Sequence, residues 1–249
     1  MCELFGVSSN ESVKAEYLLK EFFSKAKMHP DGWGVAWYSD EKLAGMVKEP
    51  VPANRSKLPG FFAERVESKL IIAHIRKKSR GSHLSYVNTH PFVRRLWGKD
   101  LVFAHNGDVP HVKKDPKYKL KTFFPAGETD SEHAFCYMLE SLSASQKEGL
   151  KELAEEIWKY AEDVGSLGKF NFLLSDGKYL LAYMNRERTL HYLLNPGSLK
   201  KNLNDEKKEK LKASVISTEK LTDEDWIQMQ LRTLYIFRDG ELVFKVKLE

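Results

Sequence analysis

The sequence predicts an α+β fold in which antiparallel sheets are covered by helices. Apolar runs typical of strands occur towards both ends of the chain, and a block of two helices lies between them. Asp176-Gly177 and Asp239-Gly240 each separate two such runs, which is a strong signal for a β-hairpin. Strands and helices do not alternate regularly, as they would in a doubly wound parallel sheet. The antiparallel arrangement is therefore favoured.

The elements of the N-terminal half follow from hydrophobic periodicity. After a first strand, apolar residues recur at helical spacing, and Pro30 ends that segment. Short apolar runs then predict strands, the last of which breaks at Asn106-Gly107. The first helix contains Val13, Tyr17, Leu18, Phe22 and Phe23, a second covers part of Leu58–Ser68, and the strands are Gly34–Tyr38, Leu43–Val47, Leu70–Ile75 and Leu101–His105.

The C-terminal half begins with the two central helices and is otherwise rich in strands. The first of these helices starts at Thr129-Asp130 with acidic residues in its opening turn, as the helix dipole favours. No repeat or low-complexity linker divides the sequence, so we expect residues 1–249 to form a single domain. The predicted helices are Ser131–Leu142 and Lys147–Val164, and the strands are Phe170–Ser175, Tyr179–Met184, Leu190–Leu194, Ser214–Ser217, Leu234–Phe237 and Leu242–Val246.

Composition places the chain among soluble globular proteins, with 42% hydrophobic and 30% charged residues. Cys2 and Cys136 are the only cysteines, which excludes a disulfide framework and indicates a reducing compartment. No signal peptide and no apolar stretch of ~18 residues is present, so we expect a cytoplasmic protein without membrane contact. The net charge is +5, and the mixed-charge run Lys200–Lys212 is typical of a solvated face rather than a nucleic-acid surface.

Cys2 stands at the start of an apolar run that reaches Val7. A small residue after the initiator lets methionine aminopeptidase remove Met1, which leaves a thiol and a free α-amine on one residue. The amine has a pKa of about 7.7–8.0, so it can act as a base near neutral pH, and a nucleophile with an adjacent base suffices for acyl transfer. Taken alone, Cys2 favours the alternative of an ordinary buried cysteine, because reactivity requires an accessible, electropositive setting.

Three polar clusters directly follow apolar strand runs. Arg76 and Ser79 offer a guanidinium fork and a hydroxyl that suit a carboxylate, or they belong to a basic surface loop. Asn106 and Gly107 offer an amide and a backbone N–H for an oxyanion hole, or they form a turn. Asp130 offers a carboxylate for an ammonium group, or Thr129 or Asp130 caps a helix, and both roles can hold at once.

Four histidines invite a metal hypothesis, but their spacing matches no zinc signature. Two of them lie inside apolar strand runs, where a packed or hydrogen-bonded ring is the better interpretation. The sequence therefore predicts neither a metal ion nor a cofactor. The four are His74, His83, His90 and His105.

Together these residues resemble the class II glutamine amidotransferases, a branch of the N-terminal nucleophile hydrolases. The resemblance covers nearly the whole chain and is strongest to stand-alone members of the YafJ and Dug3 type, which carry no fused synthase domain. It implies a four-layer αββα sandwich of two antiparallel sheets. Six motifs occur in the family's order: Met1–Gly6, His29–Gly34, Ala73–Arg76, Asn88–Phe92, Ala104–Gly107 and Gly127–Glu132.

The resemblance also implies a mechanism. After loss of Met1, Cys2 attacks the γ-carboxamide of glutamine with its own α-amine as proton shuttle, ammonia leaves, and water hydrolyses the γ-glutamyl thioester. The other implied roles are Asn106 and the Gly107 backbone at the oxyanion, Arg76 and Ser79 at the substrate α-carboxylate, and Asp130 at the α-ammonium group.

The chain departs from the synthase-linked pattern at three places. Lys77 stands where an aromatic residue usually follows the arginine, Ser79 replaces a threonine, and Met28-His29 replaces a frequent Arg-Gly pair. These departures keep the glutamyl contacts but leave the leaving group open, so hydrolysis of another γ-glutamyl amide or peptide is the close alternative. Because glutamine hydrolysis alone would be wasteful, a separate synthase subunit is the other expectation. A chain that kept Met1 would be a non-catalytic subunit.

Overall fold

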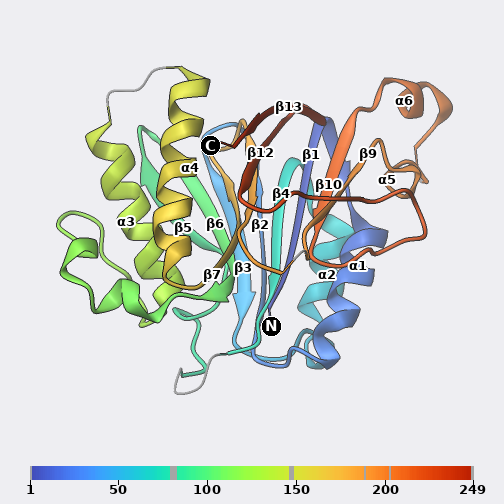
Figure 1. Ribbon diagram of the computed structural model, residues 1–249. Coiled ribbons are helices and arrows are strands. Elements are labelled where there is room, and N and C mark those ends of the chain that lie inside the picture. The colour runs from blue at the N-terminus through green and yellow to red at the C-terminus, as the bar shows by residue number, and fades with distance from the viewer. Residues whose placement is uncertain (1, 79–82, 146–148, 188, 202, 248–249) are drawn as a thin grey trace.

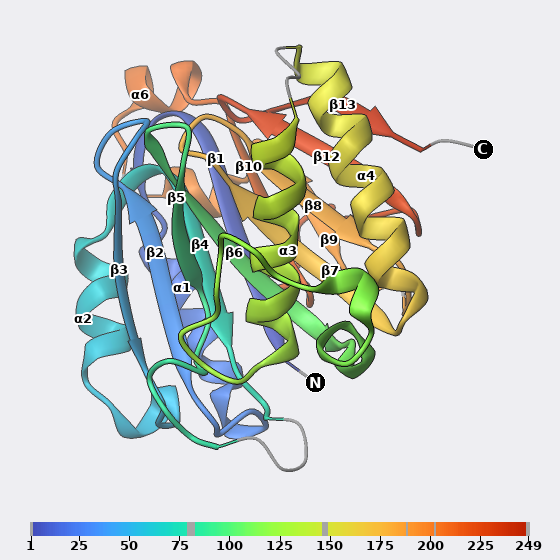
Figure 2. The ribbon, with the colours of Figure 1, turned by 90° about the vertical axis from the view of Figure 1, so that its left-hand side faces the viewer.

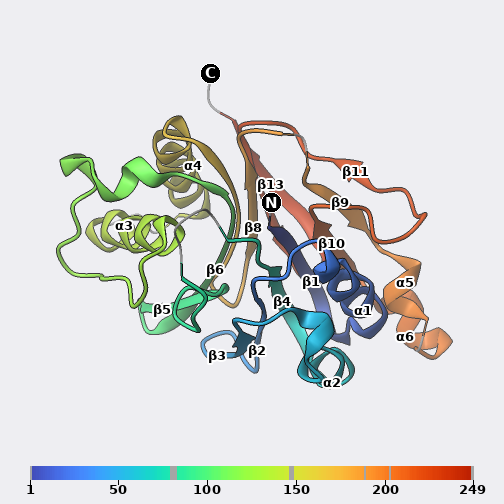
Figure 3. The same ribbon diagram turned by 90° about the horizontal axis from the view of Figure 1, so that it is seen from below.

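Two antiparallel sheets pack face to face, and helices cover both outer surfaces in the computed structural model (Figures 1 and 3). The structure describes residues 2–78, 83–145, 149–187, 189–201 and 203–247. The predicted α+β class and the four-layer αββα sandwich are confirmed.

The first sheet has seven strands within the described ranges, in the order β11-β9-β10-β1-β4-β2-β3. All of its neighbouring strands pair antiparallel, and β1 lies at the centre between β10 and β4. The N-terminal strand is therefore fixed on both edges. The strands are β1 (Glu3–Lys14), β2 (Trp33–Tyr38), β3 (Ala44–Glu49), β4 (Glu67–Ile75), β9 (His191–Leu194), β10 (Ala213–Ser217) and β11 (Ile227–Gln228).

The second sheet has six strands among the described residues, in the order β13-β12-β8-β7-β6-β5. The hairpin predicted at Asp239-Gly240 is present, and both loop residues have positive φ (50° and 80°), as a two-residue type I′ turn requires. The hairpin expected around Asp176-Gly177 also forms, between β7 and β8. The strands are β5 (Phe92–Leu96), β6 (Lys99–Asp108), β7 (Lys169–Ser175), β8 (Leu180–Met184), β12 (Thr233–Arg238) and β13 (Glu241–Val246).

Helices divide between the two outer faces. On the first sheet, α1 and α2 bury apolar residues against β1, β2 and β4. On the second sheet, α3 and α4 lie across the outer face (Figure 2) and share a core with β6, β7 and β8. The helices are α1 (Glu16–Ser24), α2 (Leu58–Arg65), α3 (Asp130–Ala144), α4 (Leu150–Ser166), α5 (Gly197–Lys200) and α6 (Asp205–Lys210), with short 3₁₀ segments at Lys25–Lys27, Ala53–Arg55, Pro110–Lys113 and Pro116–Tyr118.

A third core between the two sheets explains where the first residues of the chain point. Leu4 of β1 and Ala104 of β6 both face this inner core. Since strand side chains alternate with a period of two, Cys2 points to the same side as Leu4, and Asn106 to the same side as Ala104. The start of β1 thus lies where the two sheets meet (Figure 3).

Three expectations about elements are wrong. Val13, expected in the first helix, belongs to β1, because the strand continues past an irregularity between Ser8 and Val13 and pairs again with the start of β4. Asn106-Gly107 does not break the strand, since β6 runs on to Asp108 and pairs with β7. The third error is an omission, because the sequence did not predict four of the elements: β5, β11, α5 and α6.

The mixed-charge run at 200–212 contains the exposed helix α6, in which Lys208 pairs with Asp205 and Lys210 with Glu206. This arrangement agrees with the predicted solvated face. Within the described part of the chain, no helix combines the length and apolar character needed to cross a bilayer.

Candidate active site

A cavity of about 450 Å³ opens where the start of the chain meets the ends of β4 and β6 and the beginning of α3. It is lined by four of the six residues expected to act in catalysis or substrate binding: Cys2, Arg76, Gly107 and Asp130. Asn106 adjoins them through a hydrogen bond to Cys2. The remaining candidate, Ser79, lies outside the described residues. Segments far apart in the sequence therefore converge on one site.

Cys2 is held by the peptide groups of Lys77. Its thiol donates to the Lys77 carbonyl at 3.3 Å, and the Lys77 N–H donates to Sγ at the same distance. The register of β1 on β4, which sets Glu3 opposite Ile75, produces this contact. Burial raises the pKa of the thiol, although the Lys77 hydrogen bond and the charge of Arg76 oppose the shift. A protonated thiol needs a base before it can attack.

Asn106 and Gly107 lie in β6, so their alternative interpretation as a turn is wrong. The Asn106 side-chain amide donates to the Cys2 carbonyl at 2.5 Å. An amide nitrogen carries two N–H donors, so one is left for another acceptor. At Gly107 a Cβ atom would come within 1.8 Å of the Lys169 carbonyl oxygen, so only glycine allows β6 and β7 to approach this closely.

Arg76 directly follows β4 and is only 3% exposed, which excludes the alternative of a surface loop for this residue. Its backbone N–H donates to the Gly32 carbonyl at 2.7 Å, and its carbonyl accepts from the Asp31 N–H at 3.0 Å. Both terminal guanidinium nitrogens lie 3.4 Å from the His83 carbonyl. Burial lowers the pKa of Arg76, against the opposing charges of Cys2 and Asp31. A buried guanidinium that lines a cavity suits a carboxylate ligand.

Asp130 opens α3, but Thr129 caps the helix by accepting the Glu132 N–H at 3.1 Å. The Asp130 carboxylate accepts the N–H of Val109 at 2.6 Å and that of Ser131 at 2.8 Å. A carboxylate has about four lone-pair sites. Two backbone donors therefore orient Asp130 and leave acceptor capacity towards the cavity.

His105 links β6 to the start of α3. Its Nε2 lies 3.2 Å from the Lys169 carbonyl, which can only accept, so Nε2 carries the proton. Nδ1, at 2.8 Å from Ser131 Oγ, must then accept from that hydroxyl. Burial lowers the pKa of His105 to about 4, despite the hydrogen bond to Lys169.

His74 and His90 extend this buried group of rings. His74 Nε2 donates to the His105 carbonyl at 3.1 Å, and burial lowers its pKa to about 3. The His90 ring stacks on His74 with centroids 4.2 Å apart. The interpretation as packed or hydrogen-bonded histidines is confirmed for these rings, although nothing in the sequence indicates that His74 connects β4 of one sheet to β6 of the other.

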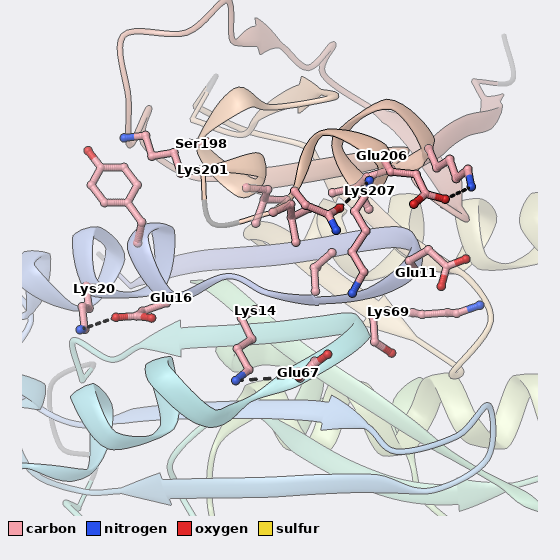
Figure 4. A pocket seen from close by; sticks show the side chains of 18 residues that line it. Glu11, Lys14, Glu16, Lys20, Glu67, Lys69, Ser198, Lys201, Glu206 and Lys207 are labelled. Carbon is pink, nitrogen blue, oxygen red and sulfur yellow. Dashed lines mark hydrogen bonds and ion pairs between the residues drawn. The ribbon is translucent and has the colours of Figure 1, made fainter.

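A second cavity, of about 850 Å³, lies between β1, α1 and α6 (Figure 4). Its charged lining consists of lysines and glutamates, some of which pair with each other, as Lys20 does with Glu16 at 2.8 Å. No cysteine or histidine of the described ranges lines it. Although it is larger, its described lining offers neither a thiol nor an imidazole, so the Cys2 cavity is the candidate active site.

A cysteine at the start of a central strand, between two packed sheets and in one cavity with an arginine and an aspartate, is the arrangement of an N-terminal nucleophile hydrolase. The model of the family described as glutamine amidotransferases class-II matches residues 1–249, and the chain belongs to this family. The protein is therefore an enzyme of the glutamine amide-hydrolysing type, with an N-terminal cysteine nucleophile.

Relatives agree with this assignment. The chain is 38% identical to an uncharacterized protein of Methanocaldococcus jannaschii over 99% of its own length and 72% of that protein. It is 34% identical to YafJ of Escherichia coli, described as a candidate glutamine amidotransferase, over 78% of this chain and 76% of YafJ. A crystal structure of a predicted glutamine amidotransferase from Pseudomonas aeruginosa superposes with a TM-score of 0.68 at 25% identity, covering 98% of this chain and 100% of that one.

Proposed function

We propose that the protein hydrolyses the γ-carboxamide of glutamine, or of a related γ-glutamyl amide, through a thioester on Cys2. The observation that carries this proposal is the shared cavity, which Arg76 and Asp130 line together with Cys2. A cation and an anion suit the α-carboxylate and α-ammonium groups of an amino acid. The thiol then meets the γ-amide.

The first half-reaction forms the thioester. With Met1 removed, the α-amine of Cys2 takes the thiol proton, and Sγ bonds to the amide carbon. The oxyanion accepts from the second N–H of the Asn106 amide and from the Gly107 backbone, and one such donor is worth about 2.7–4 kcal/mol. The α-ammonium then protonates the amide nitrogen, the carbon–nitrogen bond breaks, and the amine or ammonia leaves.

The second half-reaction restores the enzyme. The α-amine takes a proton from a water molecule as the water oxygen bonds to the thioester carbon. The carbon–sulfur bond breaks, the proton returns to Sγ, and glutamate leaves. Arg76 and Asp130 keep the glutamyl group in place through both steps, which holds the reacting carbon beside Sγ.

The organisation of the chain supports two further parts of the proposal. We propose that residues 1–249 form one domain, because β1 pairs with β10, so that segments far apart in the sequence share a sheet. We also place the protein in the cytoplasm, since Cys2 and Cys136 are both free thiols. If glutamine is the substrate and ammonia is released, we also propose a separate synthase subunit that uses the ammonia.

The decisive experiment uses the protein without Met1, verified by intact mass. It is incubated with glutamine and a panel of γ-glutamyl amides, and free glutamate is measured. Cys2→Ala should lose activity, whereas Cys136→Ala, the matched control in α3, should keep it. Full activity of Cys2→Ala, or no glutamate from any compound, would refute the proposal. Equal activity of protein that retains Met1 would refute the role of the α-amine.

A further inference from the structure

Four lysines surround the mouth of the Cys2 cavity and have no part in the chemistry above. We call them the lysine rim. All four line the cavity and are exposed. Two follow Arg76 after β4, and two lie where the 3₁₀ segment after β6 ends. The rim consists of Lys77, Lys78, Lys113 and Lys114.

The charge of the lysine rim is not neutralised by the described part of the protein. None of its members forms an ion pair with a described carboxylate, although the chain has many such pairs elsewhere. Lys113 Nζ donates to a backbone carbonyl, that of Glu128, at 2.5 Å. Clustered ammonium groups repel one another, so an anion placed among them is attracted to the cluster.

The acidic residues of the same cavity do not cancel the rim. Asp130 is assigned to the substrate ammonium group, and the Glu128 carboxylate binds His83 at 2.9 Å and Asn88 at 3.2 Å. Arg76 is offset by the α-carboxylate of a bound glutamyl group. The four lysines then face only Asp108 and Glu128 among the lining acids, which leaves an excess of positive charge.

The position of the rim relative to the nucleophile identifies which part of a substrate it meets. Lys77 contributes the two peptide groups that flank Sγ at 3.3 Å. A group that leaves the γ-carbon therefore leaves beside Lys77. In the proposed binding mode Arg76 and Asp130 take the α-carboxylate and α-ammonium groups, which lie at the other end of the glutamyl chain from the γ-amide. The rim meets the amine portion, and a cavity of about 450 Å³ falls within the range that holds ligands larger than a single amino acid.

We infer that the preferred substrate is a γ-glutamyl amide whose amine portion carries an anionic group, a carboxylate or a phosphate. This inference rests on the proposed function. In the first half-reaction the amide nitrogen takes the proton from the Cys2 α-ammonium, and the anionic amine leaves instead of ammonia. Glutamine and neutral γ-glutamyl amides use the same catalytic groups but lack the contact with the lysine rim.

The test compares matched pairs of substrates. For a carboxylate, kcat/KM is measured for γ-glutamyl-glycine and γ-glutamyl-glycinamide. For a phosphate, it is measured for γ-glutamyl-phosphoethanolamine and γ-glutamyl-ethanolamine. The readout is the ratio within a pair, followed across variants, so that the intrinsic difference between leaving groups cancels. The pair whose kcat/KM ratio changes more when the lysine rim is substituted identifies the anion.

The variants separate charge from shape. The double variant Lys77→Gln/Lys113→Gln should lower the ratio about fivefold, since partly exposed ion pairs contribute modestly. Lys77→Arg/Lys113→Arg keeps the charge and should keep the ratio. Lys208→Gln on α6 is the control remote from the cavity. Raising the salt from about 0.05 M to about 0.5 M should lower the wild-type ratio, because screening weakens exposed charge interactions.

The outcomes are distinct. One outcome is that the enzyme releases glutamate while neither kcat/KM ratio changes with Lys77→Gln/Lys113→Gln or with salt. In that case the inference is overturned and the proposed function stands. If the protein lacking Met1 releases glutamate from none of these compounds nor from glutamine, both fail. A ratio that falls equally in the glutamine and arginine variants would show a structural effect and would also overturn the inference.

Discussion

Acidification should destabilise this fold through its buried histidines. His74, His90 and His105 are 0%, 4% and 1% exposed, and their rings lie together between the sheets and α3. Burial lowers the pKa of His74 to about 3 and that of His105 to about 4, and it lowers the pKa of His90 well below the ordinary value. In an unfolded chain each imidazole titrates near 6.5.

The sign and size follow from proton linkage. Below about pH 6.5 the unfolded chain binds protons that the folded protein does not, so the free energy of unfolding decreases as the pH falls. The loss begins near about pH 6.5 and ends as the folded rings titrate, near the pKa values of about 3 and about 4. At about pH 5, His74 and His105 each lower the free energy of unfolding by about 2 kcal/mol, or by about 4 kcal/mol together. His90 lowers it further.

Denaturant unfolding at a series of pH values, followed by tryptophan fluorescence, measures this effect directly. The expected slope near about pH 5.5 is roughly 1.2 kcal/mol per pH unit for each buried histidine. His74→Leu should reduce the slope by one such contribution, and His111→Gln in an exposed 3₁₀ turn is the matched control for loss of an imidazole. A free energy of unfolding that changes by less than about 1 kcal/mol between about pH 7.5 and about pH 5 would refute the reasoning.

Three further substitutions test individual contacts. Asn106→Ala should lower kcat by about 10²–10³ with little change in KM, as removal of an oxyanion donor does; a kcat within about threefold of wild type would contradict its role. Gly107→Ala places a Cβ 1.8 Å from the Lys169 carbonyl, so thermal unfolding should show a loss of about 1–3 kcal/mol or more, and an unchanged Tm would contradict the close approach. Glu132→Gln weakens a 1% exposed carboxylate that binds Arg94 and two backbone N–H groups, and denaturant unfolding should show a loss of about 1.5–3 kcal/mol; no loss would mean that the network is not stabilising.

The fold was predictable where local chemistry and tertiary structure agree. Asp239-Gly240 supplies the two positive φ angles of its hairpin, so these two residues suffice to predict the turn. The place of Val13 in a strand could not be predicted, because Val13 fits the helical spacing of the next segment. Pairing with Ser68 across an irregular register keeps it in β1. β5 could not be predicted, because Arg94 and Arg95 interrupt its apolar run. A strand at the edge of a sheet tolerates such charged residues.

The sequence names several residues that line the cavity but does not indicate their geometry. The motifs named Arg76 and Asp130, which do line the cavity with Cys2. The peptide groups of Lys77 that hold the thiol could not be foreseen, since backbone contacts carry no residue-type signal and depend on the β1–β4 register. Of the two residues that could cap α3, Thr129 does so, and Asp130 lines the cavity.

His105 shows why a packing role and a functional role need not compete. Its ring donates to the Lys169 carbonyl and accepts from Ser131, so it joins the strand that carries Asn106 to the helix that carries Asp130. Only a neutral imidazole has one donor and one acceptor; a protonated ring would donate from Nδ1 too, so the Ser131 hydroxyl would have to turn and accept, and the ring would remain charged in an apolar core. The same protonation that costs folding free energy therefore reverses the hydrogen bond that joins β6 to α3. Loss of stability in acid and loss of site geometry should have a common origin at this residue.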